Sequence, residues 1–448
     1  MINSRWATFR GKRVLLLQGP VGPFFWRLAK VLEQVGARVH KVNFNGGDWL
    51  FYPTGATAWR GSMADWPAYF EHLLEELEID IVVLFGDCRP IHRPTRQIAL
   101  RHGVTVGAFE EGYVRPNFIT FEQFGVNGYS LLPRDPLAYS VLADQPNSPE
   151  REVGNAFWHA ALWATLYYIA SALLHPLFRR YHHHRPLTIR EAWPWARSAW
   201  RKVLCRWTER GTMELLTGSL SGKFYLAPLQ ISFDSQVKQH SEFASVTDFI
   251  RKVVASFAAH APADTALVVK HHPLDRGYHD YRRLIRQLAA DFGLGQRLHY
   301  IHDQHLPTLF QHMRGAVVIN STVGFSSLTH GAALKACGVA IYNLDRLTFQ
   351  GSLDEFWAAA CTFCPEMDLF ARFRSYLINH TQINGSFYKG GIDPNLCTSM
   401  ASLQTKDLTP ASEHTFLIEA RVSAEVRSRV HAIVASGSSQ PLARRNRP

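Results

Sequence analysis

Two adjacent carboxylates stand directly behind an apolar run in the first half of the chain. Glu110 and Glu111 follow the run Val104–Phe109 and precede the turn Gly112-Tyr113. If both carboxylates are buried, their like charges raise the pKa of one of them, and such a group can serve as a general base or as a nucleophile. Arg115, just beyond the turn, could hold an acidic group of a substrate by a bidentate contact. The alternative is a solvated acidic turn.

A second group of residues could stabilise a phosphate. Lys270-His271-His272-Pro273 follows an apolar run, and Arg276 comes three residues later. Because Pro273 keeps the preceding residue extended, the imidazole of His272 can point away from the strand end. A cation or a histidine donor at this place can stabilise the phosphate of a departing nucleotide. A structural role for the histidines is the alternative.

A third motif, Asn320-Ser321-Thr322, follows another apolar run and opens a helical pattern. Free backbone N–H groups at the start of a helix suit a phosphate. The hydroxyl of Ser321 could equally cap the helix, since serine and threonine favour that position. His330 lies farther along the same pattern, and we expect it to face the same site.

Two polar motifs follow the first two predicted strands. Gln18-Gly19-Pro20 combines glycine and proline at a strand end, where glycine permits close approach of the backbone to a ligand. Asn45 and Asp48 lie in the motif Asn-Phe-Asn-Gly-Gly-Asp, and such side chains can bind sugar hydroxyls or cap turns. On these residues alone, ligand binding and an ordinary turn remain open for both motifs.

The elements that must position these residues alternate between strand and helix. We predict strands at Arg13–Gln18, Ala37–Phe44, Ile79–Phe85, Val104–Phe109, Phe224–Leu229, Leu267–His271, Leu298–Ile301, Ala316–Ile319 and Val339–Asn343. We predict helices at Phe24–Val35, Asp65–Leu77, Arg93–Arg101, Val246–Ala259, His279–Phe292, Phe325–Ala336 and Glu413–Ala435. This alternation is typical of α/β folds with parallel sheets, whose sites lie at the carboxyl ends of the strands.

Composition narrows the class of protein. The chain has 448 residues, 46% of them hydrophobic, and a formal net charge of +11, so it has ample apolar material for several domains. A basic excess suits nucleic acid, an anionic membrane surface or phosphorylated ligands, but no nucleic-acid-binding motif is present. The six cysteines are scattered except for Cys361 and Cys364, and we expect reduced, buried thiols.

The middle of the chain differs from both halves. Phe157–Phe178 contains no Asp, Glu, Lys or Arg, and Arg179–Arg210 is rich in arginine and tryptophan. As one helix the first segment would be about 33 Å long, close to the thickness of a bilayer core. A membrane-surface element is the preferred interpretation, ahead of a buried bundle and of a true span. His159, His175 and Pro176 interrupt the segment and argue against the span.

Five segments make up the predicted organisation. An N-terminal Rossmann-like domain carries the carboxylates, and a helical insert able to associate with membranes follows it. A second Rossmann-like domain binds the nucleotide, and a helical segment and a disordered tail end the chain. The corresponding ranges are 10–150, 151–212, 213–360, 361–435 and 436–448.

Taken together, the motifs resemble a known family. QGPVGPFF, NFNGGD, EEGYVRP, KHHPLDRG and NSTVGFSSLTHG are similar, in order and spacing, to motifs of the capsular polysaccharide β-Kdo transferases of the KpsS/LipB type. The resemblance implies a GT-B fold of two doubly wound domains facing a cleft. It also implies retaining transfer of β-Kdo from CMP-β-Kdo to a phosphatidylglycerol-type lipid, which starts the poly-Kdo linker of a Gram-negative capsule. It implies no metal and no cofactor.

The resemblance also implies roles for particular residues. Related Kdo and sialic acid transferases share an acidic-acidic-Gly motif and a His-Pro motif, which match Glu110-Glu111-Gly112 and His272-Pro273 here. We expect Glu111 to be the catalytic carboxylate, with Glu110 as the other candidate. The expected location is cytoplasmic and peripheral, at the inner face of the cytoplasmic membrane, with other capsule proteins as possible partners and no nucleic acid. A transferase for another nucleotide sugar and a non-catalytic capsule assembly or export component are the alternatives.

Overall fold

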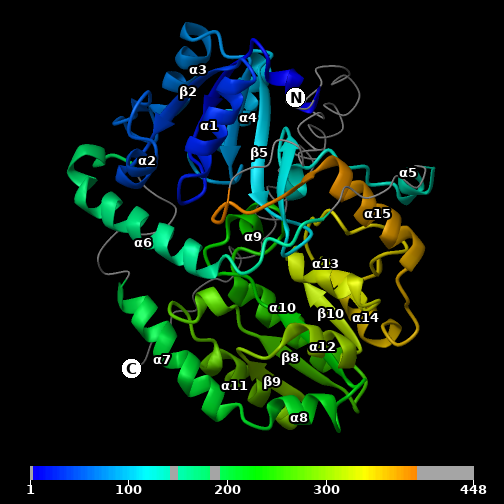
Figure 1. Cartoon of the computed structure of the whole chain (residues 1–448). Coiled ribbons are helices and arrows are strands. Elements are labelled where there is room, and N and C mark those ends of the chain that lie inside the picture. Colours follow the sequence, from blue (N-terminus) through cyan, green and yellow to red (C-terminus); the bar gives the residue numbers. More distant parts are fainter. Residues whose placement is uncertain (1–3, 142–149, 182–191, 391–448) are drawn as a thin grey trace, which may run out of the picture. The chain divides into compact units, whose positions relative to one another are not determined.

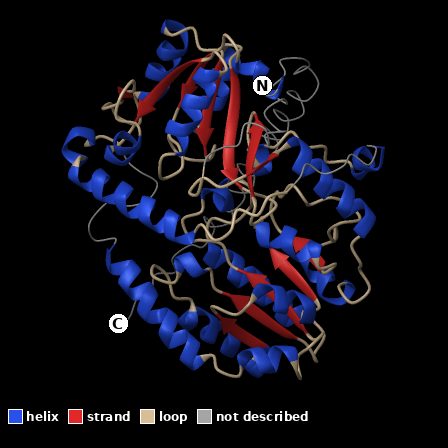
Figure 2. Ribbon diagram, viewed as in Figure 1, coloured by secondary structure: helices blue, strands red, loops and turns tan. Residues whose placement is uncertain are grey.

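The computed structural model describes residues 4–141, 150–181 and 192–390 (Figure 1). Within these ranges the strands form two sheets, one of seven and one of five strands. Figure 2 shows both sheets in red with helices beside them. The described residues belong to one compact unit, and the predicted helix Glu413–Ala435 and the predicted tail lie outside them.

The first sheet has the strand order β12-β6-β5-β4-β1-β2-β3. Its parallel strands are β1 (Arg13–Leu16), β2 (Arg38–Asn43), β3 (Thr57–Ala58), β4 (Ile81–Phe85) and β5 (Thr105–Glu111). Val, Ile and Leu fill the interior strands because both faces of a parallel sheet are covered. The accompanying elements are η1 (Ser4–Phe9), α1 (Phe24–Gln34), α2 (Gly46–Phe51), α3 (Trp66–Glu76), α4 (Thr95–Arg101), η2 (Asn127–Tyr129) and α5 (Pro136–Val141).

The second sheet has the order β11-β10-β7-β8-β9, with all its paired strands parallel. Its strands are β7 (Phe224–Pro228), β8 (Ala266–Lys270), β9 (Leu298–Ile301), β10 (Gly315–Val318) and β11 (Ala333–Ala336). The accompanying elements are α8 (Thr212–Thr217), α9 (Ser235–Gln239), α10 (Val246–His260), η5 (Pro273–Asp275), α11 (Arg282–Asp291), η6 (Gly295–Arg297), α12 (Leu306–His312), α13 (Thr322–Thr329), α14 (Leu353–Ala359) and α15 (Met367–His380).

Both sheets share one doubly wound topology. Numbered within each half, the five parallel strands run in the order 3-2-1-4-5, which is the Rossmann order. The direction of winding therefore reverses between β1 and β4 in the first sheet and between β7 and β10 in the second. Ligands of such folds bind beside these switch points, at the carboxyl ends of the strands. The predicted α/β class is confirmed.

The fifth strand of the second sheet lies earlier than we predicted. Val339–Asn343 is not a strand, and the predicted helix Phe325–Ala336 ends at Thr329. Gly331 has φ +67° and reverses the chain, so that Ala333–Ala336 pairs with β10 instead. Ala, Leu and Lys are strong helix formers, and this local preference led to the wrong prediction.

Two antiparallel strands complete the first sheet and were not predicted. β6 (Phe118–Gln123) pairs with β5, and β12 (Gln382–Asn384) pairs with β6. After α15 the chain therefore returns from the second half to the first sheet. Only long-range pairing places β12, because three residues carry too little pattern to be found in a sequence.

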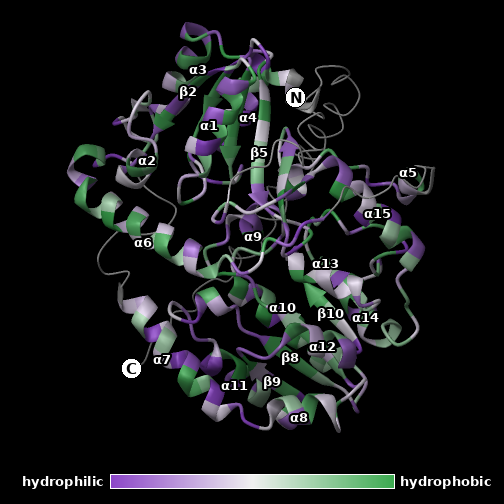
Figure 3. Ribbon diagram, in the orientation of Figure 1, coloured by the Kyte–Doolittle hydropathy of each residue, from purple (hydrophilic) through white to green (hydrophobic). Residues whose placement is uncertain are grey.

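Within its described residues, the insert forms two α-helices and one short 3-10 helix. α6 spans Phe157–Leu173, and the short helix η3 (His175–Phe178) follows it, so the apolar segment is not one continuous helix. Pro176 explains the break because proline cannot donate the next helical hydrogen bond. α7 spans Ala192–Thr208, and Figure 3 shows green residues along α6 and purple ones interleaved along α7. Among the described residues, no helix combines the length and apolar character needed to cross a bilayer.

The described cysteines are free thiols, but only part of the prediction about their burial holds. Cys88 and Cys205 are buried, whereas Cys361 and Cys364 are exposed. The Cys361–Cys364 pair lies in the turn after α14, at the surface. Cys397 is outside the described residues.

Candidate active site

The first switch point brings together the residues that follow β1 and β4. The guanidinium of Arg89 donates through Nη1 to Gln18 Oε1 and to the carbonyl oxygen of Gly19, both at 3.1 Å. It also lies over the Phe85 ring, 4.7 Å from the centroid. Sequence reasoning missed Arg89, although Gly86–Pro90 is a polar turn directly after a predicted strand, which was the available signal.

Glu110 and Glu111 end β5 on opposite faces of the strand, since successive side chains alternate. Burial raises the pKa of Glu110 to about 8, the charges of Asp87 and Glu111 add to the rise, and Arg89 opposes it. Glu110 Oε1 accepts a hydrogen bond from the backbone N–H of Glu111 at 3.0 Å. Glu111 Oε1 accepts one from the hydroxyl of Tyr388, also at 3.0 Å. The two carboxylates therefore have different surroundings.

The loop after β4, which follows the strand next to Glu110, connects the first sheet to the end of α9 in the second half. Asp87 is buried, and Oδ2 accepts a hydrogen bond from the backbone N–H of Val126 at 2.9 Å. Next to it, Cys88 Sγ contacts His240 Nε2 at 3.3 Å. Burial lowers the pKa of His240 to about 3 and raises that of the Cys88 thiol, so both side chains are neutral at neutral pH.

The second switch point joins the residues that follow β7 and β10. Gln230 Nε2 donates to Asn320 Oδ1 at 2.9 Å, and Asn320 Nδ2 donates to the Gln236 carbonyl in α9 at 3.3 Å. Ser321 caps α13, since its hydroxyl accepts from the N–H of Val323 at 3.2 Å. α9 thus contacts Asn320 at one end and, through His240, the loop before Arg89 at the other.

The Lys-His-His-Pro motif is held mainly by its own neighbours. His272 Nδ1 accepts from the N–H of Leu274 at 3.2 Å and so caps η5, which begins at Pro273. Lys270 is buried, and Nζ donates to the His302 carbonyl at 2.7 Å. Arg276 pairs with Asp303 at 2.6 Å. A phosphate would compete with the last two of these contacts.

Two arginines of α7 in the insert donate hydrogen bonds to the loop that follows this motif. Arg197 Nε donates to the Gly277 carbonyl, and Arg201 Nη1 donates to the Arg276 carbonyl at 2.8 Å. In return, Arg276 Nη1 donates to the Ser198 carbonyl at 3.4 Å. The arginines of this segment are therefore partly structural, whereas we expected them to lie at the membrane surface.

α6 of the insert covers the motif that contains Asn45 and Asp48. Asn45 Nδ2 donates to the Tyr167 hydroxyl at 2.7 Å, and that hydroxyl donates to Asp48 Oδ1 at 2.8 Å. A methyl group on Gly46 would lie 2.3 Å from the Ala170 carbonyl oxygen, and one on Gly47 would lie 2.5 Å from the Tyr167 ring. The two glycines allow α6 to pack directly on α2. The polar side chains of this motif are therefore hydrogen-bonded to α6.

The remaining predicted residues are spread over the two halves. Pro20 is buried, and Thr322 is the first residue of α13. Arg115 is exposed, with Nε donating to the Gly112 carbonyl at 3.2 Å. His330 caps the far end of α13, about 13.5 Å from Ser321 along the helix, because nine residues at about 1.5 Å each separate them. We had expected His330 to lie beside the phosphate-binding candidates, but the structure does not place it there.

Glu111 lines a small cavity. The cavity has a volume of about 220 Å³ and lies between the end of β5, the segment after β12 and the start of α6. Its walls include Phe118, Phe157, Ala160 and Tyr388. This volume is below the roughly 300–1,000 Å³ of sites for drug-sized ligands, so the cavity fits only a small group.

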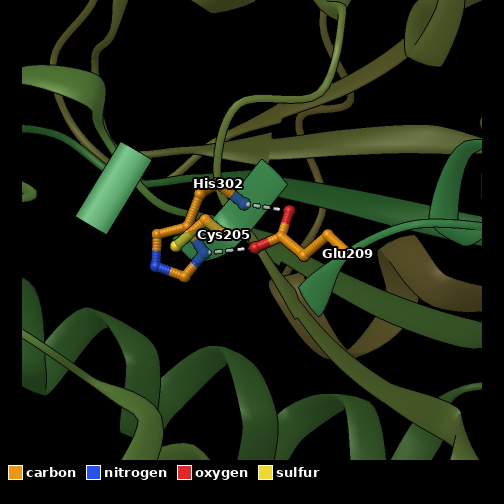
Figure 4. A group of neighbouring side chains, drawn as sticks. All are labelled: Cys205, Glu209 and His302. Carbon is orange, nitrogen blue, oxygen red and sulfur yellow. Dashed lines mark hydrogen bonds and ion pairs between the residues drawn. The ribbon is translucent and has the colours of Figure 1, made fainter. Parts of the chain in front are cut away.

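Within the described ranges, Cys205, Glu209 and His302 form one cluster with the donor atoms of a metal site (Figure 4). The Glu209 carboxylate is already engaged: Oε1 lies 2.5 Å from His302 Nδ1, and Oε2 accepts from the His302 N–H at 3.1 Å and from Gln304 at 3.2 Å. Burial raises the pKa of the Cys205 thiol, which disfavours the thiolate that metals bind. The arrangement fits a structural role: Glu209 is a clamp that holds the end of α7 to the end of β9 by hydrogen bonds.

Two doubly wound parallel sheets, with a carboxylate pair and polar motifs at the carboxyl ends of their strands, define an α/β protein of the doubly wound class. The chain belongs to the family described as "Capsule polysaccharide biosynthesis protein", whose model matches residues 80–388. Together with the curated relatives, this match confirms the predicted resemblance to the KpsS/LipB type.

The curated relatives cover nearly the whole chain. It is 41% identical over 397 residues to "Capsule polysaccharide export protein KpsS" of Escherichia coli, covering 86% of this chain and 99% of that protein. It is 39% identical over 406 residues to "Capsule polysaccharide modification protein LipB" of Neisseria meningitidis, with 88% and 96% covered. Among solved structures, the β-Kdo 2,7 transferase KpsC of Thermosulfurimonas dismutans aligns at 14% identity with a TM-score of 0.37, over 81% of this chain and 99% of that one.

Proposed function

We propose that this protein is a retaining glycosyltransferase that moves β-Kdo from CMP-β-Kdo to a phosphatidylglycerol-type lipid and so starts the poly-Kdo linker of a capsule. Family membership supports a role in capsule synthesis. The observation that carries the chemistry is the carboxylate pair at the end of β5, where burial raises the pKa of Glu110 to about 8 and Glu111 accepts a hydrogen bond from Tyr388. When the surroundings of two carboxyl groups separate their pKa values, one group commonly acts as the acid and the other as the nucleophile.

The proposed mechanism has two steps. Glu111 attacks the anomeric carbon of Kdo as the bond to the CMP phosphate breaks, and Glu110 transfers its proton to an oxygen of the departing phosphate. The acceptor hydroxyl then attacks the same carbon, the bond to Glu111 breaks, and the Glu110 carboxylate takes the hydroxyl proton. Two inversions give net retention, and Glu110 regains its starting protonation state.

The leaving phosphate needs stabilisation from the second half. Asn320, Ser321 and Thr322 lie at the second switch point and the start of α13, where backbone N–H groups and hydroxyls suit an anion. His272 and Arg115 are proposed to assist at the phosphate and at the sugar carboxylate. These groups supply the stabilisation without a divalent cation, so we propose that neither a metal nor a cofactor takes part.

The insert is proposed to hold the protein at the inner face of the cytoplasmic membrane. Its two helices expose large apolar side chains, which disfavours a bundle buried within this chain. Surfaces of this kind commonly mark interaction sites with proteins or membranes, and tryptophan and arginine together suit a lipid interface. The exposed residues are Phe157, Trp158, Leu162, Leu166, Ile169 and Leu173 on α6 and Trp193, Trp195, Trp200, Val203 and Trp207 on α7.

One experiment tests the reaction. Purified protein is incubated with CMP-Kdo and a fluorescent phosphatidylglycerol analogue, with and without EDTA, and the products are identified by mass. We expect one or more Kdo additions in both samples, and their loss in Glu111→Gln. Glu76→Gln is a matched control, because Glu76 is an exposed carboxylate on α3.

The outcomes separate the alternatives. Transfer from a UDP-sugar but not from CMP-Kdo would identify another nucleotide-sugar transferase. The printed name of KpsS, an export protein, favours a second candidate, a non-catalytic component of capsule assembly or export. Capsule synthesis that persists in cells carrying Glu111→Gln would support that candidate, and strong inhibition by EDTA would overturn the metal-free mechanism.

A further inference from the structure

The carboxylate assigned as the nucleophile receives its hydrogen bond from a residue far along the chain. The hydroxyl of Tyr388 donates to Glu111 Oε1 at 3.0 Å, although 277 positions separate the two residues. Among the residues that the structure describes, no other group donates to this carboxylate and no cation pairs with it. The orientation of the Glu111 carboxylate therefore rests on this one contact.

Three contacts fix Tyr388 beside the end of β5. The preceding residue, Phe387, is buried, and its ring meets the Phe24 ring edge-on with 4.8 Å between centroids. The backbone N–H of Tyr388 donates to Ser386 Oγ at 3.1 Å. Its carbonyl oxygen accepts from Trp163 Nε1 of α6 at 3.0 Å. The segment after β12 is thus anchored in the core of the first half and on the insert, which gives the hydroxyl a defined place.

The contact lies where a ligand can reach the carboxylate. Glu111 and Tyr388 are both half-buried, and both line the cavity at the end of β5. The hydroxyl of Tyr388 engages Oε1, whereas Oε2 of Glu111 accepts no hydrogen bond within the described part of the chain. One oxygen is therefore held, and the other is available to attack a carbon atom.

The hydrogen bond matters most when negative charge returns to Glu111. In the covalent adduct of the proposed mechanism, Oε2 is bonded to the anomeric carbon and Oε1 is the carbonyl oxygen of an ester. In the second step the acceptor oxygen bonds to that carbon, the bond to Oε2 breaks with its electron pair, and the hydroxyl proton goes to Glu110. Hydrogen bonds to charged groups are stronger than those to neutral groups, so the Tyr388 hydroxyl stabilises the departing carboxylate while it keeps its own proton.

We propose that Tyr388 is a positioning residue for Glu111: its hydroxyl holds Oε1, leaves Oε2 to attack, and assists release of the carboxylate in the second step. The inference deepens the proposed function and rests on it for the identity of the reaction. It also gives α6 a second role, because Trp163 of that helix holds the backbone of Tyr388.

The test removes one oxygen atom. Tyr388→Phe deletes the hydroxyl, and Tyr168→Phe makes the same change on another half-buried tyrosine, which does not contact Glu111. We expect kcat to fall about 10- to 100-fold in Tyr388→Phe, the usual loss for one hydrogen bond to a charged group. The ratio kcat/KM for CMP-Kdo should fall less, because it reports only the steps up to formation of the adduct. Tyr168→Phe should match the wild-type protein.

Two further measurements follow the contact itself. Intact-mass spectrometry of protein quenched during turnover should show a larger fraction with covalently bound Kdo in Tyr388→Phe, because the second step is slowed more than the first. Carbon NMR of protein labelled at glutamate needs no activity, and Glu111→Gln assigns the carboxyl signal of Glu111. That signal should move in Tyr388→Phe and stay in place in Tyr168→Phe. If it moves but the wild-type protein transfers no Kdo, the proposed function falls while Tyr388 remains the residue that positions Glu111.

An unchanged Glu111 signal in Tyr388→Phe, or a wild-type kcat in this variant, would overturn the inference. Trp163→Phe decides the matter should Tyr388→Phe fail to fold, since it keeps an aromatic ring but removes the N–H that holds the Tyr388 carbonyl. It should move the same signal and lower kcat by a smaller factor, because the hydroxyl is still present. A Trp163→Phe protein with the wild-type signal and kcat would contradict the connection between α6 and Glu111.

Discussion

Removing two tryptophans from the outer faces of the insert should weaken binding to membranes without affecting the fold. The change is Trp158→Ser on α6 together with Trp200→Ser on α7, where the side chains are 76% and 63% exposed. Complete burial of a large apolar side chain is worth about 1.5–3 kcal/mol, so partial burial of each ring in a lipid interface contributes about 1–2 kcal/mol. Both rings together account for roughly 2–4 kcal/mol, which corresponds to a fall of about 30- to 700-fold in the partition coefficient.

Sedimentation with sucrose-loaded vesicles measures this coefficient. Vesicles containing phosphatidylglycerol are titrated against wild-type protein, the double variant and the control Phe292→Ser, which removes an aromatic ring that is 45% exposed at the end of α11. Thermal melts should be nearly superimposable, because substitutions of exposed side chains commonly change stability by less than about 0.5 kcal/mol. If the double variant sediments as the wild-type protein does, the apolar faces of α6 and α7 are not the membrane contact.

Three further predictions concern stability. Gly47→Val places atoms where the buried ring of Tyr167 already lies, with the first carbon 2.5 Å from it, and should lower the free energy of unfolding by about 1–3 kcal/mol; an unchanged urea midpoint would contradict the packing of α6 on α2. Glu209→Gln weakens the clamp between α7 and the end of β9 and should cost about 1–3 kcal/mol, with faster hydrogen exchange in α7 as its specific sign. Burial raises the pKa of Glu110 from 4.5 to about 8, so the folded chain keeps a proton that the unfolded chain has released in this window. The free energy of unfolding should therefore fall as the pH rises between these values. Thermal melts of Glu110→Gln should show a smaller fall over the same pH range. Part of the fall should remain in this variant, because burial also raises the pKa of Glu122 to about 7.

The sequence predicted most of the secondary structure because the parallel strands are short, apolar and separated by helices. Arg13–Leu16 and Leu298–Ile301 lie within the predicted ranges, since a strand covered on both faces has a nearly continuous apolar pattern. The wrong prediction for Ala333–Ala336 has a different origin. There, residues with high helix propensity are forced into a strand by pairing with β10, and pairing of this kind is not encoded locally.

The candidate site was predictable in part. Polar residues after strands identified Glu110 and Asn320, because a doubly wound sheet places such residues at one edge. The same rule could have identified Arg89, which also follows a strand. It could not identify His240, whose contact with Cys88 joins residues 152 positions apart.

The sequence by itself determined that the chain has two α/β halves, a carboxylate pair and a family, because these properties follow from local residue order. Only the tertiary structure decided which polar residues are available to a ligand. Asn45 and Asp48 have the residue types of a sugar-binding motif, yet their polar atoms contact the hydroxyl of Tyr167, more than 100 residues away. A hydrogen-bonding group can be satisfied equally well by a substrate or by another part of the chain, and only the folded arrangement decides between them.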